Sequence, residues 1–343
     1  MKKIRKSASA ILLSAVLSLS TLLAACGNQP SDQGATSGTS GSTGESRKLT
    51  AVTQVTNWFA QAEHGGLYAA KEQGYYEEAG LDMTIQPGGP QVSPTQIVAS
   101  GKAQFGLTTA DQLLVAREQG IPLVAIATIF QKSPQGLMVH ANQHIASFAD
   151  LNDRTVYVGT GSVFWDYVKG KYNLDQVQDM AYTGSLAPFV ADEKAAIQGY
   201  VTSEPYEMKQ QNVDVNFLLL ADAGYNPYSN VLFTTEQYIQ DHPDIVQAYV
   251  EASMKGWDYY KTNYDSVNDV ILKENPDFTK EKLNYAAETL IPFVYEGDAA
   301  EHGVGYMTEE RWAELGRQLV EIGALKSEPD VSKVFTDEFL PKS

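Results

Sequence analysis

The sequence predicts an α/β protein built from two lobes. Apolar segments of strand length alternate with helical segments over much of residues 48–343, and this alternation is typical of largely parallel sheets covered by helices. Residues 48–343 are too many for one small hydrophobic core, and we expect them to form two. The chain from residue 230 onward is mostly helical with no sheet of its own, so we expect it to fold back onto the first lobe.

The first 25 residues have the layout of a lipoprotein signal peptide. MKKIRK carries four positive charges, an apolar run follows it, and Leu-Ala-Ala precedes Cys26, the single cysteine of the chain. Cleavage before Cys26 would expose its thiol for attachment of a diacylglycerol. The alternatives are an uncleaved anchor and a signal peptide with an incidental cysteine. Residues 26–47 are rich in Gly, Ser and Thr, and we expect a flexible tether there.

A lipidated Cys26 excludes several kinds of chemistry. The mature chain would have no thiol for disulfides, metal thiolates or nucleophilic catalysis. No second long apolar run follows, so we expect a soluble protein that is anchored to the extracytoplasmic face of the cell membrane. The net charge of −17 disfavours nucleic acid and anionic membrane faces as partners, although solubility alone also explains a charge spread along the chain.

The expected elements follow from periodicity and from helix-ending residues. LDMTIQP alternates as a strand does, IPLVAIATIF reads as a buried strand, and TTADQLLVAREQG has helix signals at both ends. The predicted strands are 48–56, 81–87, 103–107, 121–130, 135–140, 155–160, a short one before residue 202, and 215–221. The predicted helices are 65–80, 94–100, 108–120, 147–155, two within 188–211, and 242–263 as the clearest amphipathic helix.

The motifs of common enzyme classes are absent from the sequence. It contains no G-x-G-x-x-G, no P-loop and no G-x-S-x-G. The pair His140 and His144 has i,i+4 spacing but no H-E-x-x-H context, so we expect a structural or surface role for it. We therefore expect no catalytic residues, no metal and no cofactor.

Polar residues behind strands and at helix starts are the default ligand positions in α/β lobes. The candidates of this kind are Asn57, Trp58, Thr109, Asp111, Gln131, Gly161, Ser162, Phe164, Trp165, Glu204, Tyr225 and Tyr228. The indole of Trp58 can stack on a flat ligand or pack beneath a loop, and the sequence leaves both open.

The other candidates also have two interpretations. The backbone around Gly161 and Ser162 can seat an anion or a polar edge at a helix start, with Phe164 or Trp165 as a wall and the other ring in the core. Glu204 can accept hydrogen bonds from an amidine-like edge or cap the next helix.

Two tyrosines follow the predicted strand at 215–221. Tyr225 and Tyr228 lie in the turn cluster DAGYNPYSN. They can line a cleft where the chain crosses between lobes, or they can pack within the turn.

Two blocks resemble a known family of binding proteins. The first is Asn57-Trp58, His64, Tyr68-Ala69 and Gly74-Tyr75-Tyr76, and the second is SGKAQFGLTTADQLLVAREQGIPLVAIA. Together they resemble the solute-binding proteins of thiamine-pyrimidine and alkanesulfonate importers, and the fungal thiamine-pyrimidine synthase, over roughly residues 49–263.

This resemblance implies a type II periplasmic-binding-protein fold with a ligand in the cleft between its lobes. It implies that Trp58 flanks a flat heterocycle, that His64 lies near the ligand, and that the loop 159–163 binds a polar or anionic group. Lobe I would comprise 48–138 and 224–343, and lobe II would comprise 139–223. The lobes would hinge near 135–139 and 220–224.

The resemblance favours binding over catalysis. The synthase carries a cysteine cluster where this chain has Gly224-Tyr225-Asn226-Pro227-Tyr228, and its pyridoxal lysine has no convincing counterpart here. We therefore expect a monomeric solute-binding protein that serves an ABC importer permease. A thiamine-precursor aminopyrimidine is the favoured small-molecule ligand, because the many aromatic residues suit a flat ring. A sulfonate such as taurine and riboflavin are the alternatives, and a pyrimidine synthase is less favoured.

Overall fold

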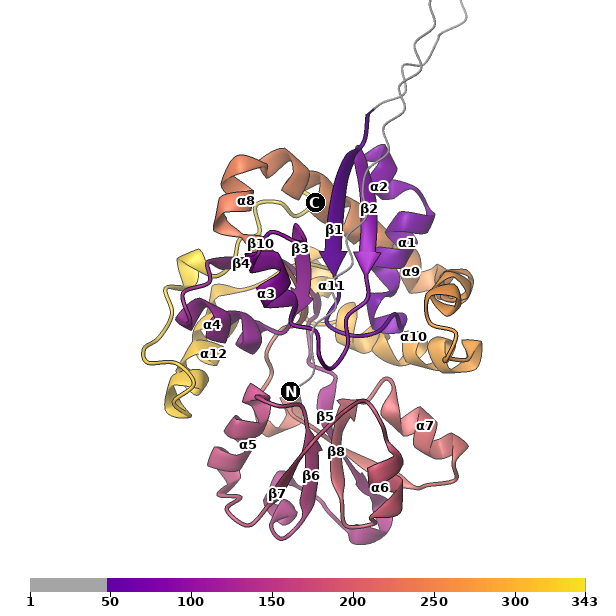
Figure 1. Ribbon diagram of the computed structural model, residues 1–343, viewed down its shortest axis with the longest axis vertical. Coiled ribbons are helices and arrows are strands. Elements are labelled where there is room, and N and C mark those ends of the chain that lie inside the picture. The colour runs from indigo at the N-terminus through magenta and orange to yellow at the C-terminus, as the bar shows by residue number, and fades with distance from the viewer. Residues whose placement is uncertain (1–47, 343) are drawn as a thin grey trace, which may run out of the picture. The chain divides into compact units, whose positions relative to one another are not determined.

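The structure, a computed structural model, describes residues 48–342. The expected signal peptide, the tether and Cys26 lie outside the described residues. Two five-stranded sheets form the framework (Figure 1). In the first sheet the strand order is β2-β1-β3-β10-β4, and in the second it is β7-β6-β8-β5-β9. The expected α/β fold with two lobes is therefore present.

The strands of the first sheet come from two separate segments of the chain, 50–130 and 229–235, whereas those of the second come from the single segment 135–219. The first sheet contains β1 (Thr50–Val55), β2 (Leu81–Gln86), β3 (Phe105–Thr108), β4 (Leu123–Phe130) and β10 (Ser229–Thr235). The second contains β5 (Gln135–His140), β6 (Thr155–Val158), β7 (Gln178–Ala181), β8 (Ala196–Tyr200) and β9 (Val215–Leu219). Strands β7 and β10 were not predicted, and the mostly helical structure expected from residue 230 is wrong for β10. Strand β7 is exposed along its length, so it lacks the apolar run that marks a strand.

Each sheet has four strands in one direction and one reversed strand. β10 is antiparallel to β3 and β4, and β5 is antiparallel to β8 and β9. β5 and β10 are the first strands that the chain forms after it has crossed from one lobe to the other. The preceding strand ends at the cleft with its carboxyl end, so the strand after the crossing begins at the cleft and runs away from the cleft. The crossings are residues 131–134 and 220–228, and the first lies before the hinge expected at 135–139, which is part of strand β5.

Helices cover the sheets of both lobes (Figure 1). Those of the first lobe before the crossing are α1 (Gly65–Glu72), α2 (Tyr75–Glu78), α3 (Pro94–Ala99) and α4 (Ala110–Glu118). Those of the second lobe are α5 (Val163–Tyr172), α6 (Ala187–Ala191) and α7 (Glu204–Gln210). The later helices are α8 (Glu236–Asp241), α9 (Pro243–Glu274), α10 (Lys280–Val294), α11 (Asp298–His302) and α12 (Glu309–Glu321).

Short 3-10 turns complete the described chain. They are η1 (Ala62–His64), η2 (Ala141–Gln143), η3 (Phe148–Leu151), η4 (Ala221–Ala223) and η5 (Val331–Lys333). The continuous helix predicted over 65–80 is wrong, because Gly74 adopts a left-handed conformation with φ of 76° and separates α1 from α2. The helix predicted over 147–155 is only the 3-10 turn η3.

The helical tail returns to the first lobe, as expected. Thr336 and Val334 exchange backbone hydrogen bonds with Ala125 of β4, and Gly305 accepts one from Thr128 of the same strand. Helix α9 packs on α1, where Gly65 and Gly66 bring the two helices together. A Cβ atom on Gly66 would lie 2.3 Å from the Trp257 ring, so only glycine allows this approach.

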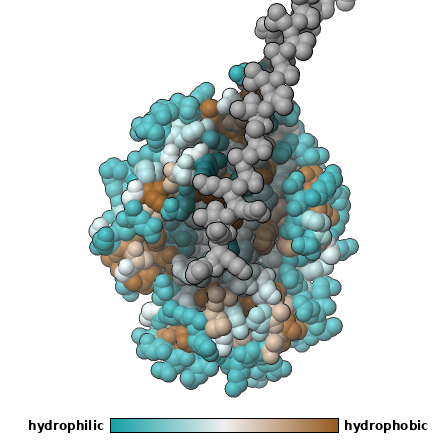
Figure 2. All heavy atoms as spheres, viewed as in Figure 1, coloured by the Kyte–Doolittle hydropathy of each residue, from teal (hydrophilic) through white to brown (hydrophobic). Residues whose placement is uncertain are grey.

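The described surface facing the viewer is dominated by hydrophilic residues, with scattered apolar positions (Figure 2). Within residues 48–342, none of the helices combines the length and apolar composition that crossing a membrane requires.

Candidate functional site

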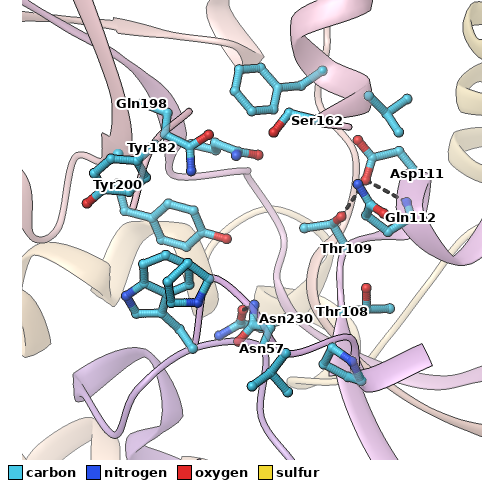
Figure 3. A pocket seen from close by; sticks show the side chains of 18 of the residues that line it. Asn57, Thr108, Thr109, Asp111, Gln112, Ser162, Tyr182, Gln198, Tyr200 and Asn230 are labelled. Atoms are coloured by element: carbon cyan, nitrogen blue, oxygen red, sulfur yellow. Dashed lines mark hydrogen bonds between the residues drawn. The ribbon is translucent and has the colours of Figure 1, made fainter. Parts of the chain in front are cut away.

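A cavity of about 480 Å³ lies between the two sheets. It is lined by residues at or just after the carboxyl ends of β1, β3, β6, β7 and β8, and by the amino ends of the reversed strands β5 and β10. This is the position at which open α/β sheets bind ligands. Figure 3 shows Asp111, Gln112 and Thr109 on one side of the cavity, with Gln198, Tyr182 and Tyr200 on the opposite side.

Two aromatic rings from different lobes lie parallel in the cavity wall. Trp58 follows β1 of the first lobe and Tyr182 follows β7 of the second, and their rings are parallel to within 7° with centroids 6.1 Å apart. Two ring faces in van der Waals contact with a third ring between them need a separation of about 7 Å. A flat ligand could therefore enter between Trp58 and Tyr182 only after the lobes part.

The backbone of Trp58 is held by hydrogen bonds to its own loop. Its carbonyl oxygen accepts from the Thr56 hydroxyl at 2.7 Å and from the Gly88 N–H at 2.9 Å. A Cβ atom on Gly88 would lie 2.1 Å from the Thr56 carbonyl oxygen, so glycine is required at this approach. The side chain of Phe59, 45% exposed, meets the edge of the Trp58 ring.

A chain of hydrogen bonds fixes two asparagines that line the cavity. His64 Nε2 lies 3.0 Å from Asn57 Oδ1, Asn57 Nδ2 donates to Asn230 Oδ1 at 3.1 Å, and Asn230 Nδ2 donates to the Glu63 carbonyl oxygen at 2.7 Å. Because the amide nitrogen of Asn57 is already committed to Asn230, its oxygen faces His64 and must accept. His64 Nε2 therefore carries the proton.

His64 is a fully buried neutral group that does not line the cavity. Burial lowers the pKa of His64 to about 3, because the imidazolium form would lose its hydration. The resemblance placed His64 near the ligand. In the structure it lies one layer behind Asn57, which it orients.

Glu204 lines the cavity at the first residue of α7. Its Oε2 accepts a hydrogen bond from the Tyr200 N–H at 2.7 Å, so the side chain turns back toward the end of β8. Gly199 leaves room for it, since a Cβ atom there would lie 2.7 Å from the carboxylate. Burial raises the pKa of Glu204 to about 7, and the nearby charge of Glu63 adds to this effect.

Asp111 forms the opposite side of the cavity, in the first turn of α4. Its Oδ1 accepts from the Thr109 hydroxyl and from the Gln112 N–H, the latter at 2.8 Å, and its Oδ2 accepts from the Tyr225 hydroxyl at 2.8 Å. The carboxylate is only 3% exposed and is surrounded by donors. Its position is therefore closely fixed.

The loop before α5 contributes hydroxyl and amide groups. Ser162 lines the cavity, and its hydroxyl donates to the Gly159 carbonyl oxygen at 2.7 Å. The Gly159 N–H donates to Gln198 Oε1 at 2.6 Å, which positions Gln198 at the cavity wall. Phe164 also lines the cavity. Trp165 faces the core, where its Nε1–H donates to Asp179 at 2.8 Å.

The structure brings together seven of the candidate side chains named from the sequence. Those lining the cavity are Asn57, Trp58, Thr109, Asp111, Ser162, Phe164 and Glu204. Those absent from its wall are His64, Gln131, Gly161, Trp165, Tyr225 and Tyr228.

Each of the outlying candidates has another place in the fold. Tyr225 is fully buried behind Asp111, and Gln131 donates to the Tyr306 carbonyl oxygen at 2.9 Å. Tyr228 packs against the Arg311 guanidinium and accepts a hydrogen bond from the Thr308 N–H at 2.9 Å. Gly161, with φ of 73°, forms the turn before α5.

Sequence reasoning missed several residues that line the cavity. The main ones are Tyr182, Gln198, Tyr200, Gln112 and Asn230. Tyr182 and Tyr200 occupy strand ends, which is the signal that identified the other candidates. Asn230 is a left-handed residue with φ of 49° at the start of β10, and such a conformation cannot be read from the sequence.

The comparisons place the chain in a family of binding proteins and related enzymes. The family model described as NMT1/THI5 like matches residues 61–266. The chain belongs to this family.

Two curated relatives align along most of the chain. The riboflavin-binding protein RibY of Chloroflexus aurantiacus is 28% identical over 312 residues, which cover 85% of this chain and 87% of the relative. The formylaminopyrimidine-binding protein of Halalkalibacterium halodurans is 25% identical, covering 78% of this chain and 84% of the relative.

A solved structure confirms the expected fold. The periplasmic aliphatic sulphonate binding protein SsuA from Escherichia coli superposes with a TM-score of 0.65 at 15% identity, covering 85% of this chain and 94% of that structure. The protein therefore has the periplasmic-binding-protein fold, with its cavity between the two lobes.

Proposed function

We propose that the protein is an extracytoplasmic solute-binding protein that captures a flat heterocycle, such as an aminopyrimidine precursor of thiamine, and delivers it to an ABC importer permease. The observation that carries this proposal is the parallel pair of Trp58 and Tyr182, which come from different lobes. Stacking on two rings holds a planar ligand by both faces. Glu204, on the cavity wall nearby, would bind the ligand's edge.

Two relatives support a heterocyclic ligand. Their names state that one binds riboflavin and the other formylaminopyrimidine, and both align with more than three quarters of this chain. Both ligands contain a planar nitrogen heterocycle. The shared chemistry is therefore a flat ring with hydrogen-bonding groups at its edge.

Closure of the lobes would complete the site. Besides the aromatic pair, the lobes are joined by the hydrogen bond from the Thr202 hydroxyl to Glu63 and by the ion pair between Lys282 and Glu207. We propose that the crossings 131–134 and 220–228 act as the hinge and that ligand bound between the rings favours the closed form.

We propose that the protein binds its ligand without converting it. Cysteine, lysine and histidine are absent from the cavity lining that the structure describes, so this lining offers no lysine to bind pyridoxal and only carboxylates, those of Asp111 and Glu204, as acidic ligands for iron. Incubation with iron and pyridoxal phosphate should yield no pyrimidine product, measured by chromatography. Formation of the product would establish an enzyme.

Calorimetric titration with formylaminopyrimidine and with riboflavin tests the proposed function. We expect at least one to bind with a Kd in or below the micromolar range, and Trp58→Ala to weaken that binding by about 1–3 kcal/mol. Met180→Ala, at an exposed side chain on β7, is the matched control and should bind as the wild type does. If neither heterocycle binds while an alkanesulfonate does, the proposal is wrong.

Riboflavin is a second candidate because of the cavity's size. A cavity on the order of 150 Å³ is enough to hold a benzene ring, so a cavity of about 480 Å³ has room for a ring system with further substituents. If riboflavin binds more tightly than formylaminopyrimidine in the same titration, the ligand is the larger heterocycle.

We further propose that Cys26 carries a lipid and that the mature protein is a monomer. The sequence pattern around Cys26 supports the lipid. Growth with a labelled fatty acid should label the wild type and leave Cys26→Ser unlabelled, and light scattering of the domain from residue 48 should give the monomer mass. Label on Cys26→Ser would exclude this attachment site.

A further inference from the structure

The charged residues described in the cavity wall are all acidic. Its two ionisable acids are Asp111 in the first lobe and Glu204 in the second, and they lie on different elements, α4 and α7. Among the wall residues that the structure describes, there is no lysine, arginine or histidine. An anionic group inside this cavity would therefore meet the carboxylate of Asp111, and above about pH 7 that of Glu204 as well, without a cation to balance it.

Buried groups behind the wall do not supply a positive charge either. His64, which supports Asn57, is held neutral by its burial. Lys282 favours the ionised form of Glu204, but it lies outside the wall and its ammonium group is paired with Glu207.

Three of the four helix N-termini at the cavity are compensated by an acid. Helices α3, α4, α5 and α7 begin at the wall, and the N-terminus of a helix can attract an anion. Asp111 in the first turn of α4 accepts the Gln112 N–H, Asp166 stands in the first turn of α5, and Glu204 stands in that of α7. Helix α3, which has six residues, has no acid in its first turn.

The remaining polar wall consists of neutral donors and acceptors. The wall contains hydroxyl groups of Thr109 and Ser162 and amide groups of Gln112 and Gln198 (Figure 3). The hydroxyl protons of Thr109 and Ser162 are donated to Asp111 and Gly159, so these hydroxyl oxygens can accept from a ligand, and the amide groups of Gln112 and Gln198 can donate to it. Such a wall matches hydroxyl or amide substituents on a ligand. The cavity volume of about 480 Å³ leaves space for such substituents beside a stacked ring.

We infer that this cavity selects neutral heterocycles bearing hydroxyl or amide groups, that it rejects their phosphate esters and sulfonated analogues, and that Asp111 determines this selectivity. The inference rests on the proposed function, because it assumes that the ring stacks between Trp58 and Tyr182. It adds that the protein takes up the unphosphorylated form of its ligand, so that phosphorylation has to follow import.

Matched pairs of ligands test the selectivity. The probes are 4-amino-5-hydroxymethyl-2-methylpyrimidine and riboflavin, each titrated beside its phosphate monoester at low salt, with ethanesulfonate as a sulfonate probe. For the parent alcohol that binds, we expect its ester to bind about 100-fold more weakly or worse, because like charges in a desolvated site repel. An ester that binds as tightly as its alcohol, or tight binding of ethanesulfonate, would overturn the inference.

Variants locate the source of the selectivity. Asp111→Asn keeps the shape of the side chain and should reduce the ratio of ester to alcohol Kd by at least about tenfold. Glu118→Gln removes an acid from the last turn of α4, which does not line the cavity, and should leave the ratio unchanged. A ratio unaltered in Asp111→Asn would show that another group sets the selectivity.

The outcomes separate the two proposals. If neither alcohol binds to the wild type or to any of the variants, the proposed function is wrong, and the inferred selectivity is wrong as well. If an alcohol and its ester bind equally well, the proposed function stands and only the selectivity is wrong. Thermal unfolding of each variant, without ligand, shows that an altered ratio does not arise from unfolding.

Discussion

The Kd of the wild-type protein for its ligand should depend on pH through the titration of Glu204. Replacement of Glu204 by glutamine should remove this dependence. An aminopyrimidine edge presents one N–H donor and one ring-nitrogen acceptor. Its best partner offers one acceptor and one donor, as a protonated carboxyl group or a carboxamide does. Burial raises the pKa of Glu204 to about 7, so the unliganded protein loses this proton near neutral pH.

The magnitude follows from linkage. The complex holds one proton shared between Glu204 and the ring nitrogen, and above about pH 7 the protein must take up that proton when the ligand binds. Each further pH unit should therefore raise the wild-type Kd about tenfold, which is about 1.4 kcal/mol. Glu204→Gln carries its donor permanently, so its Kd should stay constant over the same range apart from the titration of the ligand itself.

The same pKa shift predicts a stability difference without ligand. The pKa of Glu204 is raised on folding from 4.5 to about 7, so the wild-type free energy of unfolding falls as the pH rises through this interval. Above it the cost reaches about 3 kcal/mol. Glu204→Gln avoids this cost and should be the more stable protein at about pH 8.

Calorimetry with 4-amino-5-hydroxymethyl-2-methylpyrimidine from about pH 6 to about pH 9 measures the binding effect. Glu207→Gln is the matched control, because it is another acid of α7 that pairs with Lys282 and does not line the cavity. This control should keep the wild-type pH dependence. A flat wild-type curve, or a Glu204→Gln curve with the same slope, would refute the assigned role of Glu204.

Three other substitutions separate binding from folding. Tyr182→Ala should weaken binding of the heterocycle by about 1–3 kcal/mol, measured by calorimetry, and unchanged affinity would show that the ring does not stack there. Gly66→Ala should destabilise the fold by about 3 kcal/mol in urea unfolding, because its Cβ atom would meet Trp257 at 2.3 Å; wild-type stability would mean that α1 and α9 adjust easily. Tyr225→Phe should cost about 1–3 kcal/mol of unfolding free energy by removing the donor to Asp111, and no loss would mean that water replaces it.

Local sequence patterns predicted most of the fold because they record burial. The eight residues of β4 are all buried and appear in the sequence as a continuous apolar run. The alternation of β2, with buried residues at every second position, is equally plain. Strand β7 was missed because its four residues are exposed, so neither pattern is present.

The candidate site was only partly predictable, because direction and depth are tertiary properties. Position after a strand correctly brought Asn57, Trp58 and Glu204 to the cavity. The same reasoning could not decide which of two adjacent rings, Phe164 or Trp165, faces it. One helical step turns Trp165 into the core toward Asp179.

His64 shows a second limit of sequence reasoning. Its type and spacing indicated a group beside the ligand, but the close approach of α1 to α9 at Gly65 and Gly66 draws this segment into the core. His64 therefore acts through Asn57 and lies outside the cavity wall. Only the packing of a helix nearly 200 residues further along the chain determines this placement.

The central claim is that a flat heterocycle is held between Trp58 and Tyr182. Mass spectrometry of the small molecules released from the protein, after purification from cells supplied with riboflavin, formylaminopyrimidine and ethanesulfonate, tests this claim most directly. We predict release of a heterocycle from the wild type in stoichiometric amount and its loss from the Trp58→Ala variant. Release of the sulfonate, or equal retention of the heterocycle by the variant, would contradict the claim.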